Sequence, residues 1–288
     1  MTEGALIGAR LALMIDLALL MGLPLFWWTM GMAGRKSLLA LLAVGGVALS
    51  ALWLLASAAA MTGTPITSPD WASAQILLTM TPIGPVLAVR GAALLVAIAA
   101  LLLPGGTRWA LLPAAVATGT LAWTGHAGAT EDMAGTLHRA ADVAHIWAAA
   151  GWIGALAMLL CAVTRLRAGD NARPVATMLA RFSLMGSLVV ATLVVSGAVN
   201  VAMIVGLAQV PALLGSLYGW LLGAKLALFG LMLGLAAANR WWLTPALESG
   251  TTPQRAMMHL RLSLLVESSA AVAIIGLVAW LGTLDPMA

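Results

Sequence analysis

Apolar stretches long enough to cross a lipid bilayer follow one another along almost the whole sequence, separated by short breaks. A membrane-spanning helix needs about 20 predominantly apolar residues. Asp, Glu, Lys and Arg make up 8% of the chain, and the mean hydropathy is +1.03. Average soluble proteins contain about 25% charged residues. The chain has too little polar surface for a water-soluble fold, so we predict an all-α, polytopic membrane protein.

The apolar stretches predict about eight transmembrane helices in a single membrane domain, residues 1–288. The predicted helices cover residues 5–30, 37–62, 76–103, 107–127, 137–163, 176–207, 217–243 and 259–283. Residues 1–127 contain the first four helices and residues 128–288 the last four. Most prolines lie in or beside the breaks, as expected for residues that cannot continue a helix. Pro82 and Pro85 fall near the start of the third stretch, where we expect them to kink it.

The distribution of basic residues predicts the orientation of the chain. One set of connections carries Arg35, Lys36, Arg108, Arg165, Arg167, Arg173, Arg240 and Arg255, whereas the alternate connections carry Asp70, Glu131 and Asp132. Connections rich in Lys and Arg stay in the cytoplasm, so both termini are expected on the opposite, periplasmic side. The first apolar stretch contains Asp16, which a cleavable signal peptide would not, and we expect it to remain as a span.

The same distribution limits the classes of function. The net charge of +4 comes from single basic residues between apolar stretches, and these form no basic face for a nucleic acid. The only cysteine, Cys161, excludes a disulfide framework and a cysteine-based zinc site.

Ionisable and amide side chains inside the predicted spans mark a possible pathway, because each is costly in hydrocarbon unless paired or hydrated. The candidates are Asp16, Arg90, Asn200, Lys225 and Glu267. Asp16 and Arg90 are predicted at similar depths, which favours a structural ion pair over a transport role. Glu267 is either an inner polar station or simply a hydrogen-bond partner of Asn239.

The fifth predicted helix carries His138, Asp142 and His145 at positions i, i+4 and i+7, which fall on one face. His126 ends the preceding helix on the same side of the membrane. Imidazole and carboxylate ligands suit Cu(II), Zn(II) or Ni(II). We therefore predict a metal site at the outer mouth, although these residues could also simply cap the helix in the headgroup region. Lys225 is close enough in predicted depth to pair with Asp142.

Thioether ligands favour Cu(I), and several methionines fall near predicted outer helix ends. Met80, Met133 and Met203 are possible accessory metal ligands, although packing is the commoner role of a methionine. Below His145, the same helix face continues with Ala149, Trp152 and Leu156. The fifth helix therefore offers an outer site but no continuous ladder of ligands toward the cytoplasm.

Several short motifs resemble the copper resistance protein D (CopD) family. They are Gly125-His126-Ala127, His138, Asp142-Val143-Ala144-His145, Trp152-Ile153-Gly154, Arg181-Phe182-Ser183, Ser196-Gly197, Tyr218-Gly219-Trp220, Lys225-Leu226, Asn239-Arg240, and Arg261-Leu262-Ser263 followed by Glu267. They run from about residue 120 to the C-terminus. The resemblance implies an eight-helix protein of the bacterial inner membrane that imports copper, Cu(I) or Cu(II), and a periplasmic copper-carrying partner similar to CopC. It implies no enzymatic activity.

Three functions remain open from the sequence. The first is copper transport, with acquisition at His126, His138, Asp142 and His145. The second is delivery of copper to another protein without transport, which fits a site confined to one side. The third is haem binding, for which transmembrane histidines are common ligands.

Overall fold

The computed structural model describes residues 2–125, 132–166, 173–206, 213, 215–249 and 253–285. These residues form helices, turns and loops and contain no strand, which confirms the all-α prediction. Seven helices among them are long and apolar enough to cross a membrane. They are α1 (Thr2–Met30), α2 (Lys36–Thr62), α4 (Ile83–Leu101), α7 (Asp132–Arg165), α8 (Arg173–Ile204), α9 (Leu217–Ala238) with its continuation, and α11 (Pro253–Leu281).

The predicted third span is divided into two helices rather than kinked. α3 (Trp71–Met80) ends at Thr81, which has an extended backbone conformation, and α4 begins at Ile83. The residue before a proline is disfavoured in the helical region, so Pro82 ends α3. Asp70 caps α3, and hydrogen bonds from the Ser73 side chain and backbone hold the pKa of its carboxyl below the ordinary value.

The predicted fourth span is interrupted. It consists of α5 (Gly106–Trp109), α6 (Leu111–Gly119) and the 3-10 helix η1 (Thr120–Thr124), which follow one another beside α4. Pro113 has no N–H to donate to the carbonyl four residues earlier, which weakens the helix where α5 gives way to α6. No one of these three segments alone is long enough to cross the bilayer.

The predicted seventh span is also irregular at its end. α9 continues into the π-helix η4 (Asn239–Leu243) and then into α10 (Thr244–Ser249). The hydroxyl of Thr244 donates to the carbonyl oxygen of Asn239 at 2.8 Å. π-Helical turns are rare and often occur at functional sites.

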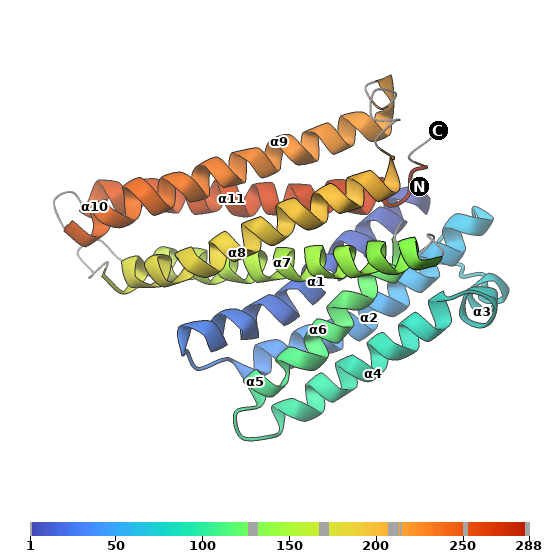
Figure 1. Ribbon diagram of the computed structural model, residues 1–288. Helices are drawn as coiled ribbons and strands as arrows, with labels where there is room; N and C mark the ends of the chain where they lie inside the picture. Colours follow the sequence, from blue (N-terminus) through green and yellow to red (C-terminus); the bar gives the residue numbers. More distant parts are fainter. Residues whose placement is uncertain are drawn as a thin grey trace.

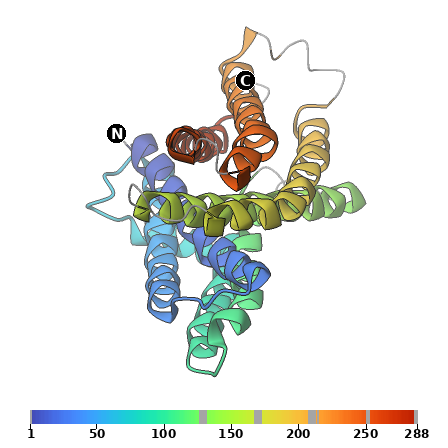
Figure 2. The ribbon, with the colours of Figure 1, turned by 90° about the vertical axis from the view of Figure 1, so that its left-hand side faces the viewer.

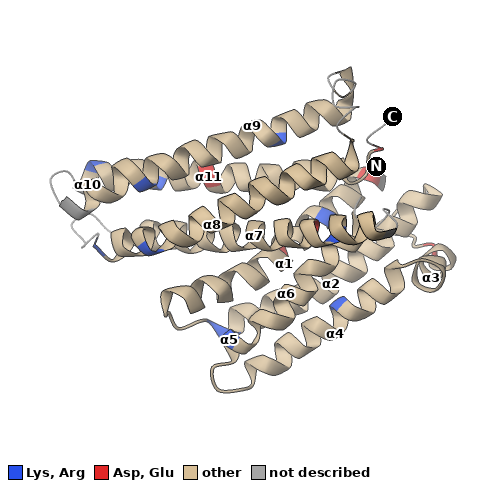
Figure 3. Ribbon diagram, in the orientation of Figure 1, with Lys and Arg blue, Asp and Glu red and all other residues tan. Residues whose placement is uncertain are grey.

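The long helix α7 lies at the centre of the bundle (Figures 1 and 2). α8, α9 and α11 lie on one side of it, and α2, α4 and α6 lie on the other, while α1 crosses α7 in close contact. Both termini lie at the same end of the bundle. Many of the Lys and Arg residues gather at the opposite end, around α5 and α10 (Figure 3).

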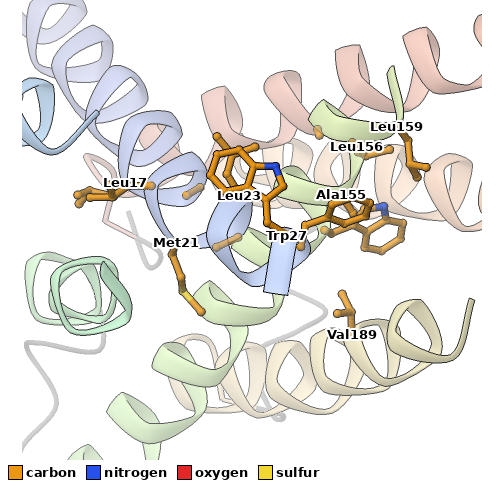
Figure 4. Close-up of a cluster of buried hydrophobic side chains, with 14 of the residues drawn as sticks. Leu17, Met21, Leu23, Trp27, Ala155, Leu156, Leu159 and Val189 are labelled. Carbon is orange, nitrogen blue, oxygen red and sulfur yellow. The ribbon is translucent and has the colours of Figure 1, made fainter. Parts of the chain in front are cut away.

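Two glycines allow the close crossing of α1 and α7. A Cβ atom on Gly22 would lie 2.0 Å from the carbonyl oxygen of Ala150, and one on Gly154 would lie 2.2 Å from the carbonyl carbon of Gly22. Small residues let membrane helices approach and gain van der Waals contact. The neighbouring core side chains labelled in Figure 4 are Leu17, Met21, Leu23, Trp27, Ala155, Leu156, Leu159 and Val189.

Candidate functional site

A cavity of about 220 Å³ lies between α1, α6, α7, α8, α9 and α11, toward the end of the bundle that holds both termini. Its polar lining consists of Arg10, Thr118, His138, Asp142, His145, Asn200, Tyr218 and Lys225. The rest of the wall is apolar and formed largely by isoleucine and valine side chains. The cavity therefore combines a cluster of potential ligands with a hydrophobic surround, as binding sites between helices commonly do.

α7 supplies the three residues that the sequence places on one helix face. His138, Asp142 and His145 all line the cavity, and His138 is almost completely buried. His126 lies outside the described residues. Among the described residues, no group of three His, Cys, Asp or Glu side chains is close enough to hold a metal ion. The three α7 side chains therefore line the same cavity but lie too far apart to coordinate one metal ion together. Their functional groups would have to move closer to do so.

Asp142 is held by a residue of α8. The amide nitrogen of Asn200 donates to Asp142 Oδ1 at 2.9 Å, and the amide oxygen of Asn200 is buried without a hydrogen-bond partner. Lys225 of α9 interacts electrostatically with Asp142, as its predicted depth suggested, but the two described side chains form no direct ion pair. The carboxylate is thus positioned by a neutral amide, which a bound cation could displace.

His145 is oriented by Ser196 of α8. The hydroxyl of Ser196 donates to the carbonyl oxygen of Thr192 at 2.5 Å, and it lies 3.0 Å from His145 Nδ1. A serine hydroxyl has one proton to donate, so towards the imidazole it acts as an acceptor. Nδ1 therefore carries the hydrogen, and the lone pair is on Nε2. A hydrogen bond to the ring nitrogen that does not bind the metal fixes the tautomer of metal-binding histidines.

Arg10 is the cavity residue that sequence reasoning missed. It lies two turns into α1, is 9% exposed and lines the cavity beside the end of α11. One terminal nitrogen packs against Gly282, where a Cβ atom would lie 2.2 Å from it. An arginine inside an apolar stretch indicates a possible functional site, because a charge in the membrane is costly.

The structure does not bring the three candidate methionines to this site. Met80 ends α3 and is 80% exposed, and Met133 begins α7 and is 87% exposed. Met203 is half-buried on α8, outside the cavity lining. The thioether groups therefore take no part in the described cavity.

Asp16 and Arg90 do not form the ion pair that we expected. Arg90 is fully buried and donates its Nε hydrogen to Thr120 Oγ1 at 2.7 Å, with its guanidinium 5.9 Å from the ring centre of Trp53. The Asp16 carboxylate faces Gly45 and Gly46 of α2. The two residues are separated because α2 packs against both α1 and α4. Similar depth in the bilayer does not make two helices neighbours.

Glu267 and Asn239 form a second polar group, in the half of the bundle away from the termini. The amide nitrogen of Asn239 donates to Glu267 Oε1 at 2.5 Å, and the Ser263 hydroxyl donates to the same oxygen at 3.2 Å. All three side chains are buried, and the amide oxygen of Asn239 has no hydrogen-bond partner. The sequence left open whether Glu267 is an inner polar station or a hydrogen-bond partner of Asn239; the hydrogen bond is present, and Asn239 begins the π-helix. The cavity lining does not extend to this group.

The fold and the cavity define a polytopic helical membrane protein with a polar site enclosed between its helices. Residues 176–281 match the family described as copper resistance protein D, and residues 1–136 match the N-terminal domain of copper resistance protein D-like proteins. The chain belongs to the copper resistance protein D family. The N-terminal match extends the relationship to the first helices, beyond the motifs that first suggested it.

Two relatives illustrate the relationship. The chain is 37% identical to copper resistance protein D of Pseudomonas syringae pv. tomato over 299 aligned positions, which cover 97% of this chain and 96% of that protein. It is 27% identical to the inner membrane protein YebZ of Escherichia coli (strain K12) over 166 positions, covering 58% and 55% of the two chains. No solved structure matches the sequence. The protein is a multi-pass inner-membrane protein of a copper resistance family.

Proposed function

We propose that this protein transports copper ions across the bacterial inner membrane, from periplasm to cytoplasm, and acquires them in the cavity lined by His138, Asp142 and His145. Membership of a copper resistance family supports copper as the ion. The observation that carries the proposal is that two imidazoles and one carboxylate line the same cavity. Ser196 orients the His145 imidazole through Nδ1, and Asp142 accepts its hydrogen bond from a neutral amide that a cation can displace.

The direction follows from a proposed topology. We place the end of the bundle with both termini in the periplasm, because Lys and Arg gather at the opposite end. In this topology the interrupted segment of α5, α6 and η1 is the eighth span, which returns the chain to the periplasmic side before α7. The cavity then opens toward the periplasm, where a copper-carrying protein similar to CopC would deliver the ion.

A second function is favoured by the limit of the cavity. Its lining ends well before Glu267 and Asn239, and no row of ligand side chains joins the two groups among the described residues. A protein that receives copper and passes it to another protein in the periplasm needs only the outer site. Uptake of copper into sealed vesicles distinguishes transport from delivery, since only the transporter moves the ion inside.

The first experiment measures copper bound by purified protein, for the wild type and for the double variant His138→Ala/His145→Ala. We expect the wild type to bind copper and the double variant to lose it. His259→Ala is the matched control, because His259 is an exposed histidine near the opposite end, on α11. Equal copper in the wild type and the double variant would contradict the proposed site. A visible absorption spectrum of the same samples tests haem, whose Soret band the copper proposal does not predict.

A further inference from the structure

The charges that line the cavity do not balance. Arg10 and Lys225 are cationic and Asp142 is the one acidic side chain in the lining, so the described wall carries a net positive charge before any copper binds. Arg10 makes no hydrogen bond or ion pair with any residue that the structure describes, and its Nε is buried without a partner. A buried charge without a partner is costly. A copper ion would add further positive charge to the same space.

The cavity is also much larger than a metal ion requires. Its volume is about 220 Å³, whereas an engineered apolar cavity of roughly 150 Å³ accepts a benzene molecule. Ile146, Ile153, Ile274 and Val278 provide apolar wall beside the basic side chains. The space therefore fits a small organic molecule with one anionic end better than it fits a hydrated ion alone.

We propose that this cavity is also a binding site for a small organic carboxylate, held by Arg10 and Lys225 beside the candidate copper ligands. A guanidinium group matches a carboxylate with two parallel hydrogen bonds. Gly282 leaves room for the Arg10 guanidinium, because a Cβ atom there would lie 2.2 Å from its terminal nitrogen. The anion compensates the excess positive charge, and its apolar part packs against the isoleucine wall.

The effect of the carboxylate on copper rests on the proposed function. A bound carboxylate would raise the affinity of the cavity for copper, because it reduces the positive charge that the incoming ion meets. The carboxylate could enter as a free anion or as a chelator already bound to copper, such as an amino acid. Binding of the anion itself, however, depends only on the cavity and on Arg10 and Lys225. It can therefore be tested with copper-free protein.

The test uses benzoate, whose ring and single carboxylate match the size and chemistry of the cavity. Binding to purified, copper-free protein is measured by saturation-transfer NMR for the wild type and for Arg10→Gln. We expect Arg10→Gln to bind about tenfold more weakly or worse, since it loses a charge-assisted, bidentate contact. Arg139→Gln is the control, because Arg139 lies on α7 close to His138 but outside the lining. Equal benzoate binding by the wild type and Arg10→Gln would overturn the proposal.

A second variant guards against a folding defect in Arg10→Gln. Gly282→Ala keeps Arg10 but forces its guanidinium to move, because the new Cβ would contact the terminal nitrogen. We expect it to weaken benzoate binding while the protein elutes as the wild type does in size-exclusion chromatography. Unchanged benzoate binding by a well-folded Gly282→Ala protein would count against a carboxylate held in the observed position of Arg10.

Copper-binding measurements distinguish the proposed carboxylate site from the proposed copper function. Copper affinity is measured with a competing chelator, with and without benzoate, and with glycine supplied as its copper complex. Tighter copper binding with benzoate, lost in Arg10→Gln, supports a free anion. An increase with the glycine complex alone supports a chelator carried by copper. Binding of benzoate without binding of copper would support the carboxylate site and contradict the copper site. Binding of copper without binding of benzoate would support the copper site and contradict the carboxylate site.

Discussion

Asn200 of α8 donates a hydrogen bond to Asp142 of α7, with 2.9 Å between the amide nitrogen and the carboxylate oxygen. This contact ties the one acidic residue of the cavity lining to the neighbouring helix. A copper ion that binds Asp142 competes with the amide for the same carboxylate. Copper binding is therefore coupled to the packing of α8 against α7, because the released amide must find another partner or remain buried without one.

Replacing Asn200 by Leu should destabilise the protein. Asp142 would lose its hydrogen bond while remaining buried, which costs about 1–3 kcal/mol. We expect a lower thermal unfolding midpoint in detergent. Val195→Leu is the control, because Val195 is a largely exposed residue of the same helix. If both variants unfold at the same midpoint as the wild type, the hydrogen bond contributes no stability.

Ser196→Ala should weaken copper binding without removing any proposed ligand. The variant loses the acceptor that keeps the hydrogen on His145 Nδ1, so Nε2 is no longer fixed as the coordinating nitrogen. Loss of a hydrogen bond that orients a metal-binding histidine typically reduces metal affinity by about 10–100-fold. Titration against a competing chelator measures the change. Thr164→Val, which removes a hydroxyl bonded within α7 near its other end, should bind copper as the wild type does.

Glu267→Gln should test whether the inner polar group takes part in copper transport. The amide keeps the size of the side chain and can still accept hydrogen bonds from Asn239 and Ser263, but it removes the negative charge. If copper crosses the membrane by way of this inner group, the variant will bind copper normally and take up less copper into vesicles. Full uptake by Glu267→Gln would exclude a role for its charge in transport. Ser268→Ala, next to it on α11, is the control.

Gly154→Ala should separate α1 from α7. The new Cβ atom would lie 2.2 Å from the backbone of Gly22, and neither backbone can move without disturbing the crossing. Overpacking of this kind costs about 1–3 kcal/mol, so we expect a lower unfolding midpoint and weaker benzoate binding. Gly8→Ala is the control, since a Cβ atom there meets nothing within 4 Å. Equal stability of the two variants would contradict a tight crossing.

Much of the fold could be predicted because transmembrane helices are encoded locally. The length and hydropathy of each stretch predicted long helices where α1, α2, α7, α8 and α11 occur. Local irregularities were harder to predict. Pro82 divides the third stretch instead of kinking it, and the fourth stretch is a series of short segments. Whether a proline bends or ends a helix depends on how neighbouring helices satisfy the freed backbone groups.

The sequence by itself determined the class of protein, the positions of its long helices and the alignment of His138, Asp142 and His145 on one face of α7, because these follow from composition and from the helical period. Only the tertiary structure decided which helices face that alignment. It brings Arg10 into the cavity and keeps Asp16 apart from Arg90, since helix neighbours are set by close crossings such as that of Gly22 and Gly154. Such contacts depend on the shapes of surfaces distant in the sequence, which no local pattern records.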